Sequence, residues 1–256
     1  EEKRYPASIT KIMTAILAFK HGNMDDIVTI PAEALNQESG STEIGFQEGD
    51  QVTLDELLHG LLIYSGNDAA VAIAQHIGGS VDQFVEMMNQ EALELGATNT
   101  HFANPSGLQD ENHYTTVRDL TKLLSYALQN DTFRQIYCTS EYTTSATASA
   151  PEGLHFLSTM FKKMDSPEVN GGEIEGGKTG YTGEAGQCLA SLAKVDDVEY
   201  ILVTAGAPGG PSTEPYHIED AKTVYNRIQA GEQGSAADTA ADSQDDQAMT
   251  ETDGAA

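Results

Sequence analysis

The sequence predicts an α/β fold in which helices precede and follow a central group of strands. Residues 8–20 carry apolar side chains at helical spacing, which indicates an amphipathic helix near the start of the chain. Residues 186–195 and 198–206 alternate well on either side of Asp196 and Asp197, a pattern typical of a β-hairpin. Residues 218–229 predict a terminal helix, so helices lie on both sides of the strands along the chain.

The segments between these elements favour further helices. Thr53 and Glu56 form a capping-box pattern, which begins a helix that runs to about residue 63. An Ala-rich helix is expected over residues 68–76. Ser80 caps the next helix, which ends near residue 95 with a glycine after it. Thr116 opens another helix with leucines on its core face.

Three segments are predicted to lack long regular elements. Residues 29–51 indicate short strands and loops, and residues 139–151, rich in Ser, Thr and Ala, indicate an exposed loop or an edge strand. Residues 230–256 are acidic and contain no Lys, Arg or aromatic residue, so they cannot bury enough apolar surface to offset their ordering entropy. We therefore predict a catalytic domain over residues 1–229 and a disordered acidic tail over residues 230–256.

The charge of the chain restricts its partners. The 256 residues carry a formal net charge of -27. This argues against binding to nucleic acid, because no basic run exists to neutralise phosphates. It also argues against charge-driven binding to an anionic membrane, and no apolar stretch approaches the roughly 18 residues of a membrane-spanning helix. We interpret the acidic residues mainly as a solvated, solubilising surface.

Neither metal nor disulfide chemistry is indicated. The two cysteines, Cys138 and Cys188, cannot form a dense disulfide framework. Cys188 alternates with apolar neighbours and is interpreted as a buried core residue. The seven histidines are scattered without metal-ligand spacing, so we expect no metal and no cofactor.

The pattern Ser8-Ile9-Thr10-Lys11 places a hydroxyl and an amine three residues apart, on one face of the predicted helix. A serine hydroxyl is a poor nucleophile until a neighbouring base takes its proton, and a lysine can be that base if burial or a second cation lowers its pKa. Ser191 and Lys194 have the same spacing, but in a strand such positions point to opposite faces. We interpret this second copy as a chance match.

Two further motifs make the first copy specific. Ser65-Gly66-Asn67 follows an apolar helix, and Lys178-Thr179-Gly180 follows two glycines. Three such motifs in this order and at such spacings resemble the penicillin-binding proteins and serine β-lactamases. The residues around the motifs, together with Asn104-Pro105-Ser106-Gly107-Leu108, look like those of the D-alanyl-D-alanine carboxypeptidases, the low-molecular-weight penicillin-binding proteins. The resemblance covers about residues 5–227.

The resemblance implies a particular version of the α/β fold. It implies an antiparallel five-stranded sheet with helices on both faces, an all-helical subdomain, and a site in the cleft between them. It also implies strands and a targeting segment upstream of Glu1. We therefore expect a processed or truncated chain, and whether the sheet is complete stays open.

Four catalytic residues are implied by the resemblance. Ser8 is expected to be the nucleophile and Lys11 the general base. Ser65 is expected to relay a proton to the leaving amine, and Asn67 to hold the substrate amide or orient Lys11.

The resemblance also implies four substrate-binding residues. Lys178 and Thr179 are expected to hold a terminal carboxylate by charge-assisted hydrogen bonds. Gly180 is expected to let the substrate backbone approach closely. The backbone N–H groups of Ser8 and Tyr181 are expected to form the oxyanion hole.

The implied function is a serine-type carboxypeptidase that removes the terminal D-alanine from peptidoglycan stem peptides. β-Lactam antibiotics are expected to acylate Ser8, and the expected location is extracytoplasmic. A β-lactamase is the nearest alternative, but Asp110 and Glu111 lack the Glu-x-x-Leu-Asn arrangement that class A enzymes use. A DD-endopeptidase stays open, and a non-catalytic cell-wall-binding module is favoured less. For His113, in the same region, a position on a surface loop is favoured over one that faces the cleft.

Overall fold

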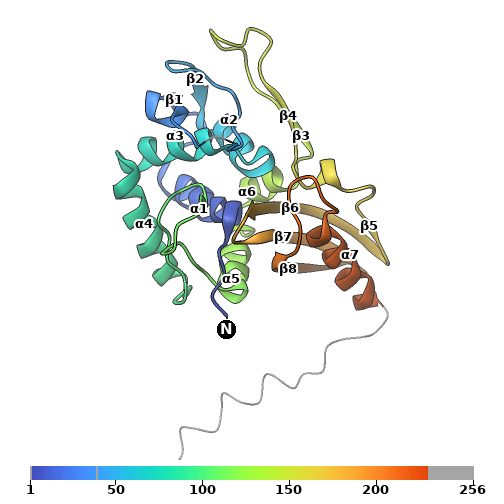
Figure 1. The fold of residues 1–256 in the computed structure, drawn as a ribbon. Helices are drawn as coiled ribbons and strands as arrows, with labels where there is room; N and C mark the ends of the chain where they lie inside the picture. Colours follow the sequence, from blue (N-terminus) through green and yellow to red (C-terminus); the bar gives the residue numbers. More distant parts are fainter. Residues whose placement is uncertain (1, 39, 230–256) are drawn as a thin grey trace, which may run out of the picture.

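Four antiparallel strands form the central sheet of the computed structural model, which describes residues 2–38 and 40–229 (Figure 1). The strand order is β5 (Glu168–Val169), β6 (Gly172–Thr182), β7 (Gly186–Val195) and β8 (Val198–Ala207). The predicted hairpin of β7 and β8 is confirmed. Asp196 and Asp197 both have positive φ, as a tight two-residue hairpin turn requires.

The predicted α/β class is confirmed, with helices on both faces of the sheet. The resemblance implied five strands, and the described residues supply four, of which β5 contributes only two residues.

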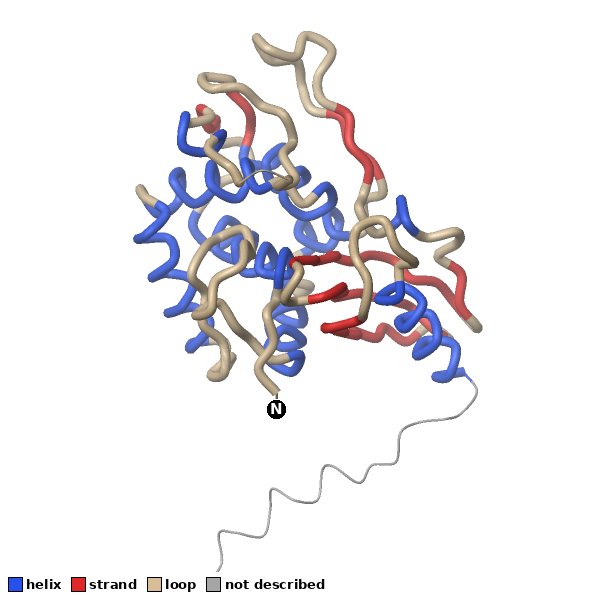
Figure 2. The backbone as a smooth tube through the Cα atoms, in the orientation of Figure 1, coloured by secondary structure: helices blue, strands red, loops and turns tan. Residues whose placement is uncertain are grey.

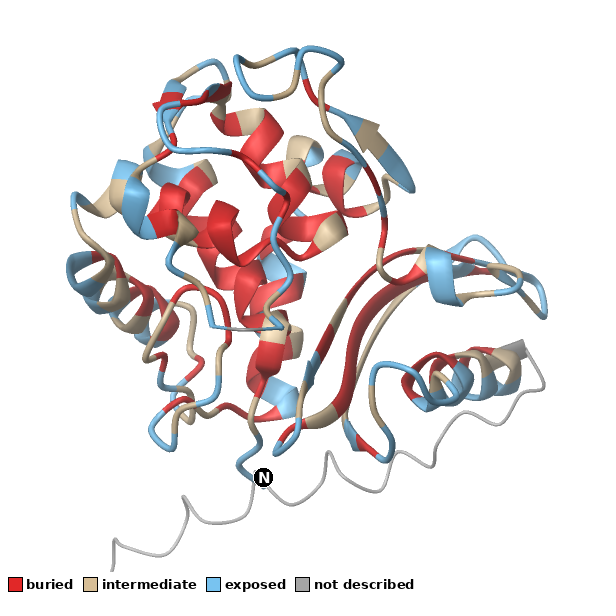
Figure 3. Cartoon of the chain, turned by 45° about the horizontal axis from the view of Figure 1, so that its top comes forward, coloured by how far each residue is buried: buried red, intermediate tan, exposed pale blue. Residues whose placement is uncertain are grey.

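Strand β7 is buried on both faces, which places the sheet between two apolar cores. Leu189 and Ala193 pack in a small core with α7 (Tyr216–Gln229). Ala190 and Leu192 belong to the larger core, which contains the remaining helices. This division follows from the alternation of side chains along a strand. Figure 3 shows the buried residues on both sides of the sheet.

The larger core is built around α1, on the side of the sheet away from α7 (Figure 2). Each residue from Lys11 to Ala18 of α1 is buried. The helices of this part are α1 (Lys11–His21), α2 (Leu54–His59), α3 (Asn67–Gly78), α4 (Val81–Glu94), α5 (Val117–Ala127) and α6 (Asp131–Tyr137). The first motif therefore opens the central helix of the domain.

Local capping signals set several of these helix boundaries as predicted. The capping box of Thr53 and Glu56 is formed at the start of α2. The side chains of Ser80 and Thr116 accept hydrogen bonds from backbone N–H groups in the first turns of α4 and α5. Gly96 has φ of 73°, as a glycine after a helix C-terminus commonly does.

Two elements were not anticipated from the sequence pattern. Helix α6 is short, with Asn130 as its N-cap. Strand β6, which carries the third motif, has four glycines among its 11 residues, and glycine is depleted in strands. Gly176 is needed there because a Cβ would lie 2.8 Å from the backbone oxygen of Tyr137.

Two short antiparallel sheets complete the described residues. β1 (Ile27–Thr29) pairs with β2 (Gln51–Thr53), and β3 (Glu141–Thr143) pairs with β4 (His155–Leu157). The two strands flank the segment 29–51, for which short strands and loops were expected, and overlap it only at Thr29 and Gln51; the described residues between them form a 3₁₀ turn, Ala32–Leu35, and loops. The connection between β3 and β4 projects from the domain in Figure 1.

The predicted tail at residues 230–256 lies outside the described residues, and its boundary with the catalytic domain stays a prediction. Among the described helices, none combines the length and apolar character that a bilayer crossing requires.

Candidate active site

The first motif lies on a 3₁₀ turn that leads into α1, although its spacing predicted one continuous α-helix. Ala7–Thr10 forms the turn and α1 begins at Lys11. Ser8 and Lys11 nonetheless face each other, with 3.1 Å between Ser8 Oγ and Lys11 Nζ. Ser8 is half-buried, whereas Lys11 is fully buried. The hydroxyl therefore lies above an amine that is removed from solvent.

Lys11 is held by two further acceptors. Its Nζ donates to Asn67 Oδ1 at 2.7 Å and to the backbone oxygen of Ser106 at 2.6 Å. Asn67 is the first residue of α3, and Ser106 lies in the loop between α4 and α5. The amine thus joins three segments that are far apart in the sequence.

Ser65 occupies an unusual backbone conformation beside this group. It ends a π-helical turn, Gly60–Tyr64, and has φ of 77°. Such turns, and positive φ at a residue other than glycine, are frequent at functional sites. The turn directs Ser65 Oγ toward β6, where it accepts a hydrogen bond of 2.8 Å from Lys178 Nζ.

Strand β6 supplies the third motif. Lys178 is fully buried and also donates to the backbone oxygen of Thr179 at 2.7 Å. Thr179 is half-buried, and its hydroxyl lies 2.7 Å from the hydroxyl of Thr159. The structure therefore brings the residues of all three motifs into one group.

Burial dominates the electrostatics of the two lysines. It lowers the pKa of Lys11 well below its ordinary value, and the nearby Lys178 lowers it further, while Asp68 partly opposes both effects. Burial lowers the pKa of Lys178 to about 7. Both amines can therefore lose a proton much more readily than an exposed lysine.

Gly180 and Tyr181 continue β6 past the 3₁₀ turn Ala7–Thr10, which carries Ser8 and is called the nucleophile turn below. A Cβ on Gly180 would lie 3.0 Å from the backbone nitrogen of Ser8 and 3.1 Å from the backbone oxygen of Pro6. Glycine at this position thus lets β6 pass close to the turn that carries Ser8. Tyr181 is 39% exposed and lines a cavity together with Ser8.

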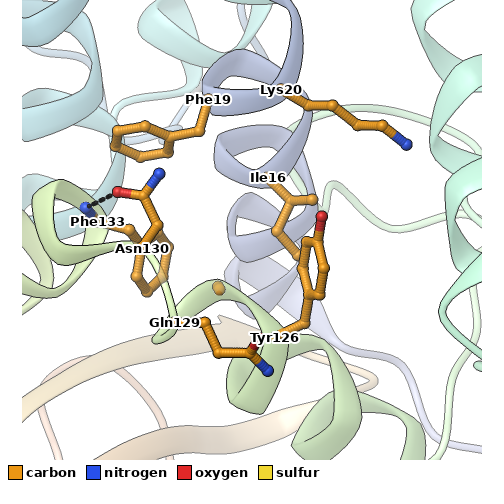
Figure 4. A pocket seen from close by; sticks show the side chains of 8 residues that line it. Ile16, Phe19, Lys20, Tyr126, Gln129, Asn130 and Phe133 are labelled. Atoms are coloured by element: carbon orange, nitrogen blue, oxygen red, sulfur yellow. Dashed lines mark hydrogen bonds between the residues drawn. The ribbon is translucent and has the colours of Figure 1, made fainter.

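This cavity has a volume of about 180 Å³. Its lining includes Ser8, Asn67, Ser106, Tyr181 and Thr182. Asp110 and Glu111, the carboxylates considered for a β-lactamase, are not among its lining residues. A separate cavity of about 290 Å³ lies between α1 and the α5–α6 region and contains none of the motif residues (Figure 4).

Several residues of the site escaped the sequence patterns. Asp68, directly after the second motif, is buried and accepts hydrogen bonds from the backbone N–H groups of Ile44 and Gly45. It thereby fastens the segment next to Thr42, whose backbone oxygen accepts from Asn67 N. Thr159 follows the β3–β4 hairpin and carries no sequence signal of its own. For Asp68, the sequence signal that was available is its position directly after the second motif.

The prediction for His113 was wrong. Its side chain is 2% exposed rather than on the surface, and its Nε2 lies 2.7 Å from Thr10 Oγ1, within the first motif. The error arose because a loop histidine is usually exposed, whereas the loop between α4 and α5 packs against the nucleophile turn.

Comparison with known proteins identifies the family of the chain. The sequence profile of a family described as D-alanyl-D-alanine carboxypeptidase matches residues 1–209. This match covers most of the chain. The chain belongs to the D-alanyl-D-alanine carboxypeptidase family.

Individual members of this carboxypeptidase family are similar to the chain in sequence. The D-alanyl-D-alanine carboxypeptidase DacF of Bacillus subtilis (strain 168) is 36% identical over 211 residues, which cover 80% of this chain and 52% of DacF. The D-alanyl-D-alanine carboxypeptidase of Streptomyces sp. (strain K15) is 36% identical over 206 residues, 75% of this chain and 69% of that protein. The chain spans about half the length of DacF and of the Haemophilus influenzae carboxypeptidase DacA.

A solved structure from the same family has the same fold. A mutant of the Streptomyces K15 DD-transpeptidase superposes with a TM-score of 0.79 and 30% sequence identity, covering 90% of both chains.

Proposed function

We propose that this carboxypeptidase-family chain is itself a serine-type D-Ala-D-Ala carboxypeptidase, which removes the terminal D-alanine from peptidoglycan stem peptides through an acyl-enzyme on Ser8. The proposal rests chiefly on one observation, the buried amine of Lys11 at 3.1 Å from the hydroxyl of Ser8. The family relationship and the intact motifs support the choice of substrate.

The partners of Lys11 suit a general base. Asn67 Oδ1 and the Ser106 backbone oxygen can only accept hydrogen bonds, so they retain the two N–H groups of a neutral amine. The remaining tetrahedral position, the lone pair, then faces Ser8 Oγ and can take its proton. The lowered pKa of Lys11 makes this neutral form accessible.

The reaction would follow in two steps. Ser8 Oγ attacks the carbonyl carbon between the two D-alanines while Lys11 takes its proton, and the backbone N–H groups of Ser8 and Tyr181 stabilise the oxyanion. The C–N bond then breaks, and Ser65 relays a proton to the leaving amine. Water hydrolyses the resulting ester, which releases the shortened peptide and restores Ser8.

Lys178 and Thr179 would bind the terminal carboxylate of the leaving D-alanine. Lys178 donates to Ser65 Oγ, so the carboxylate site and the proton relay are in direct contact. A carboxylate near Lys178 also favours its ammonium form, which partly offsets the effect of burial.

We further propose that β-lactams acylate Ser8 and that the protein acts outside the cytoplasm, where cross-linked peptidoglycan and its stem peptides lie. Both statements follow from the proposed substrate class.

The test is covalent labelling with fluorescent penicillin, followed by mass spectrometry of the labelled peptide, and release of D-alanine from a peptide ending in D-Ala-D-Ala. The parent chain should be labelled on Ser8 and should release D-alanine. Ser8→Ala should abolish both, and Lys11→Arg should lower acylation by at least about 10²-fold because a guanidinium does not deprotonate. Ser191→Ala is the matched control, since Ser191 has the same spacing to a lysine but lies in β7, where its hydroxyl is hydrogen-bonded to that of Tyr225 in α7.

Labelling that persists in Ser8→Ala would contradict the assignment. The rate of penicillin release separates the alternatives, because slow release indicates a carboxypeptidase and rapid turnover a β-lactamase. Cleavage of a cross-linked peptide dimer would identify an endopeptidase.

A further inference from the structure

His113 connects the turn that precedes Lys11 with the loop that supplies the Ser106 acceptor of Lys11. It lies in the loop between α4 and α5, which also contains Ser106, and its Nε2 is 2.7 Å from Thr10 Oγ1. Its Nδ1 is 3.0 Å from the backbone nitrogen of Ala103, in the same loop. Phe102 packs edge-on against the ring, with 5.6 Å between centroids. The imidazole is thus enclosed and bonded at both nitrogens.

The hydrogen bonds determine its tautomer. The backbone N–H of Ala103 can only donate, so His113 Nδ1 accepts and carries no proton. Nε2 therefore carries the proton and donates to Thr10 Oγ1. Burial lowers the pKa of His113 to about 4, with His101 and Lys11 adding to the effect and Asp110 opposing it. The ring is neutral at neutral pH and keeps this donor–acceptor pattern.

The hydrogen bond between His113 and Thr10 lies close to the proposed nucleophile and general base. Thr10 is fully buried and stands between Ser8 and Lys11 in the first motif. The loop on the other side of the imidazole supplies the Ser106 backbone oxygen, at 2.6 Å from Lys11 Nζ. Thr14 Oγ1 donates to the backbone oxygen of Pro105 at 2.6 Å, so the loop is attached to α1 at a second point one turn later.

We propose that His113 is a positioning residue, which fixes the Ser8–Lys11 turn against the Ser106 loop and so directs the lone pair of Lys11 toward Ser8. The hydrogen bonds of His113 go to Thr10 and Ala103 and not to Ser8 or Lys11, so it acts through Thr10. This role rests on the proposed acyl-enzyme chemistry.

The experiment measures acylation by fluorescent penicillin under single-turnover conditions, per active site, with binding separated from the acylation step. His113→Phe keeps the ring volume and removes both hydrogen bonds, so the acylation rate constant should fall by about 10- to 100-fold, as for a small misplacement of reacting groups, with little change in binding. His113→Gln can still donate to Thr10 and should recover most of the rate. His113→Asn can still accept from Ala103 but cannot reach Thr10, and it should recover less.

Two controls separate positioning from general structural damage. His101 lies in the same loop but is exposed, and His101→Phe should leave the acylation rate constant unchanged. In a Thr10→Val background, His113→Phe should cost little more, because the bond through which it acts is already absent. A loss of foldedness would instead lower the number of active sites and leave the rate constant of each site unchanged.

The outcomes distinguish this proposal from the one on which it rests. A parent chain that takes up no penicillin overturns the proposed function and the role of His113 together. A labelled parent whose His113→Phe variant acylates at the full rate overturns the role of His113 alone. Equal and additive losses from Thr10→Val and His113→Phe also overturn it.

Discussion

At the scale of single residues, the site depends on what burial does to a few polar side chains. Lys11 and Lys178 are fully buried, and each has acceptors within 3.1 Å. Their acceptors keep the amines hydrogen-bonded while burial disfavours their charge. In contrast, Ser8 and Thr179, two of the groups expected to meet the substrate, are only half-buried.

Thr179→Val tests whether this residue reads the terminal carboxylate. Hydrogen bonds to a charged group are worth about 1.5–3 kcal/mol, so kcat/KM for a peptide ending in D-Ala-D-Ala should fall by roughly 10- to 150-fold. The same peptide with an amidated terminus should be a poor substrate of the parent enzyme and should lose little more in the variant. Steady-state kinetics on both peptides provide the comparison.

Thr159→Val is the matched control, because its hydroxyl contacts that of Thr179 at 2.7 Å. Its effect should be smaller than that of Thr179→Val. If Thr179→Val lowered kcat/KM equally for the free-acid and the amidated peptide, Thr179 would not recognise the carboxylate.

At the scale of elements, the site is assembled where two segments approach the nucleophile turn at short range. Strand β6 passes at Gly180, and the loop between α4 and α5 passes at Gly107. A Cβ on Gly107 would lie 1.9 Å from the backbone oxygen of Ala7, which no side chain can accommodate without a shift. Glycines therefore set how closely the elements approach Ser8.

Gly107→Ala should destabilise the domain and slow acylation together. Gly107 has φ of 89° and would also clash with Ala7, so the free energy of unfolding should fall by about 1 kcal/mol from the conformation and by a further 1–3 kcal/mol or so from overpacking. Gly96→Ala is the control, since Gly96 has φ of 73° with nothing within 4 Å. Denaturant unfolding of both variants separates the effect of positive φ from the effect of the clash with Ala7. Equal losses in the free energy of unfolding for the two variants would show that the clash contributes nothing.

At the scale of the whole molecule, the dominant feature is charge. The chain contains 40 acidic and 13 basic residues, and its formal net charge is -27. Such an excess keeps a protein soluble, but mutual repulsion disfavours the compact state. Lys178, buried beneath this acidic surface, is the cation proposed to attract the substrate carboxylate, whereas Lys11 is proposed to act as a neutral amine.

Salt should therefore stabilise the protein. Raising NaCl from about 0.01 M to about 0.1 M shortens the Debye length from about 30 Å to about 10 Å, which weakens repulsion between surface carboxylates. A gain of about 1 kcal/mol would raise Tm by roughly 2–4 °C in a domain of this size. Calorimetry in NaCl and in KCl at equal ionic strength measures the effect. A falling Tm, or a strong difference between the two salts, would contradict simple screening.

The sequence by itself determined the features that depend on neighbouring residues. Helix starts at Thr53, Ser80 and Thr116 follow from capping, which involves side chains three residues from the groups they bind. The β7–β8 hairpin follows from alternation around a two-residue turn. The three motifs were sufficient to indicate the family, although the roles of their residues remain predictions.

Tertiary structure alone decided what each motif residue touches. Lys11 meets Asn67 and Ser106, which are 56 and 95 positions away in the chain. No local pattern encodes such contacts: the family resemblance offered Asn67 as one partner of Lys11, but the Ser106 acceptor and the full burial that lowers the pKa of Lys11 came only from the fold. Strand β6 was hidden for a related reason, because its glycines are required by neighbours packed against it rather than by its own strand propensity. His113 was misassigned because its burial depends on how its loop packs against the nucleophile turn, and packing between distant segments overrides the usual exposure of loop residues.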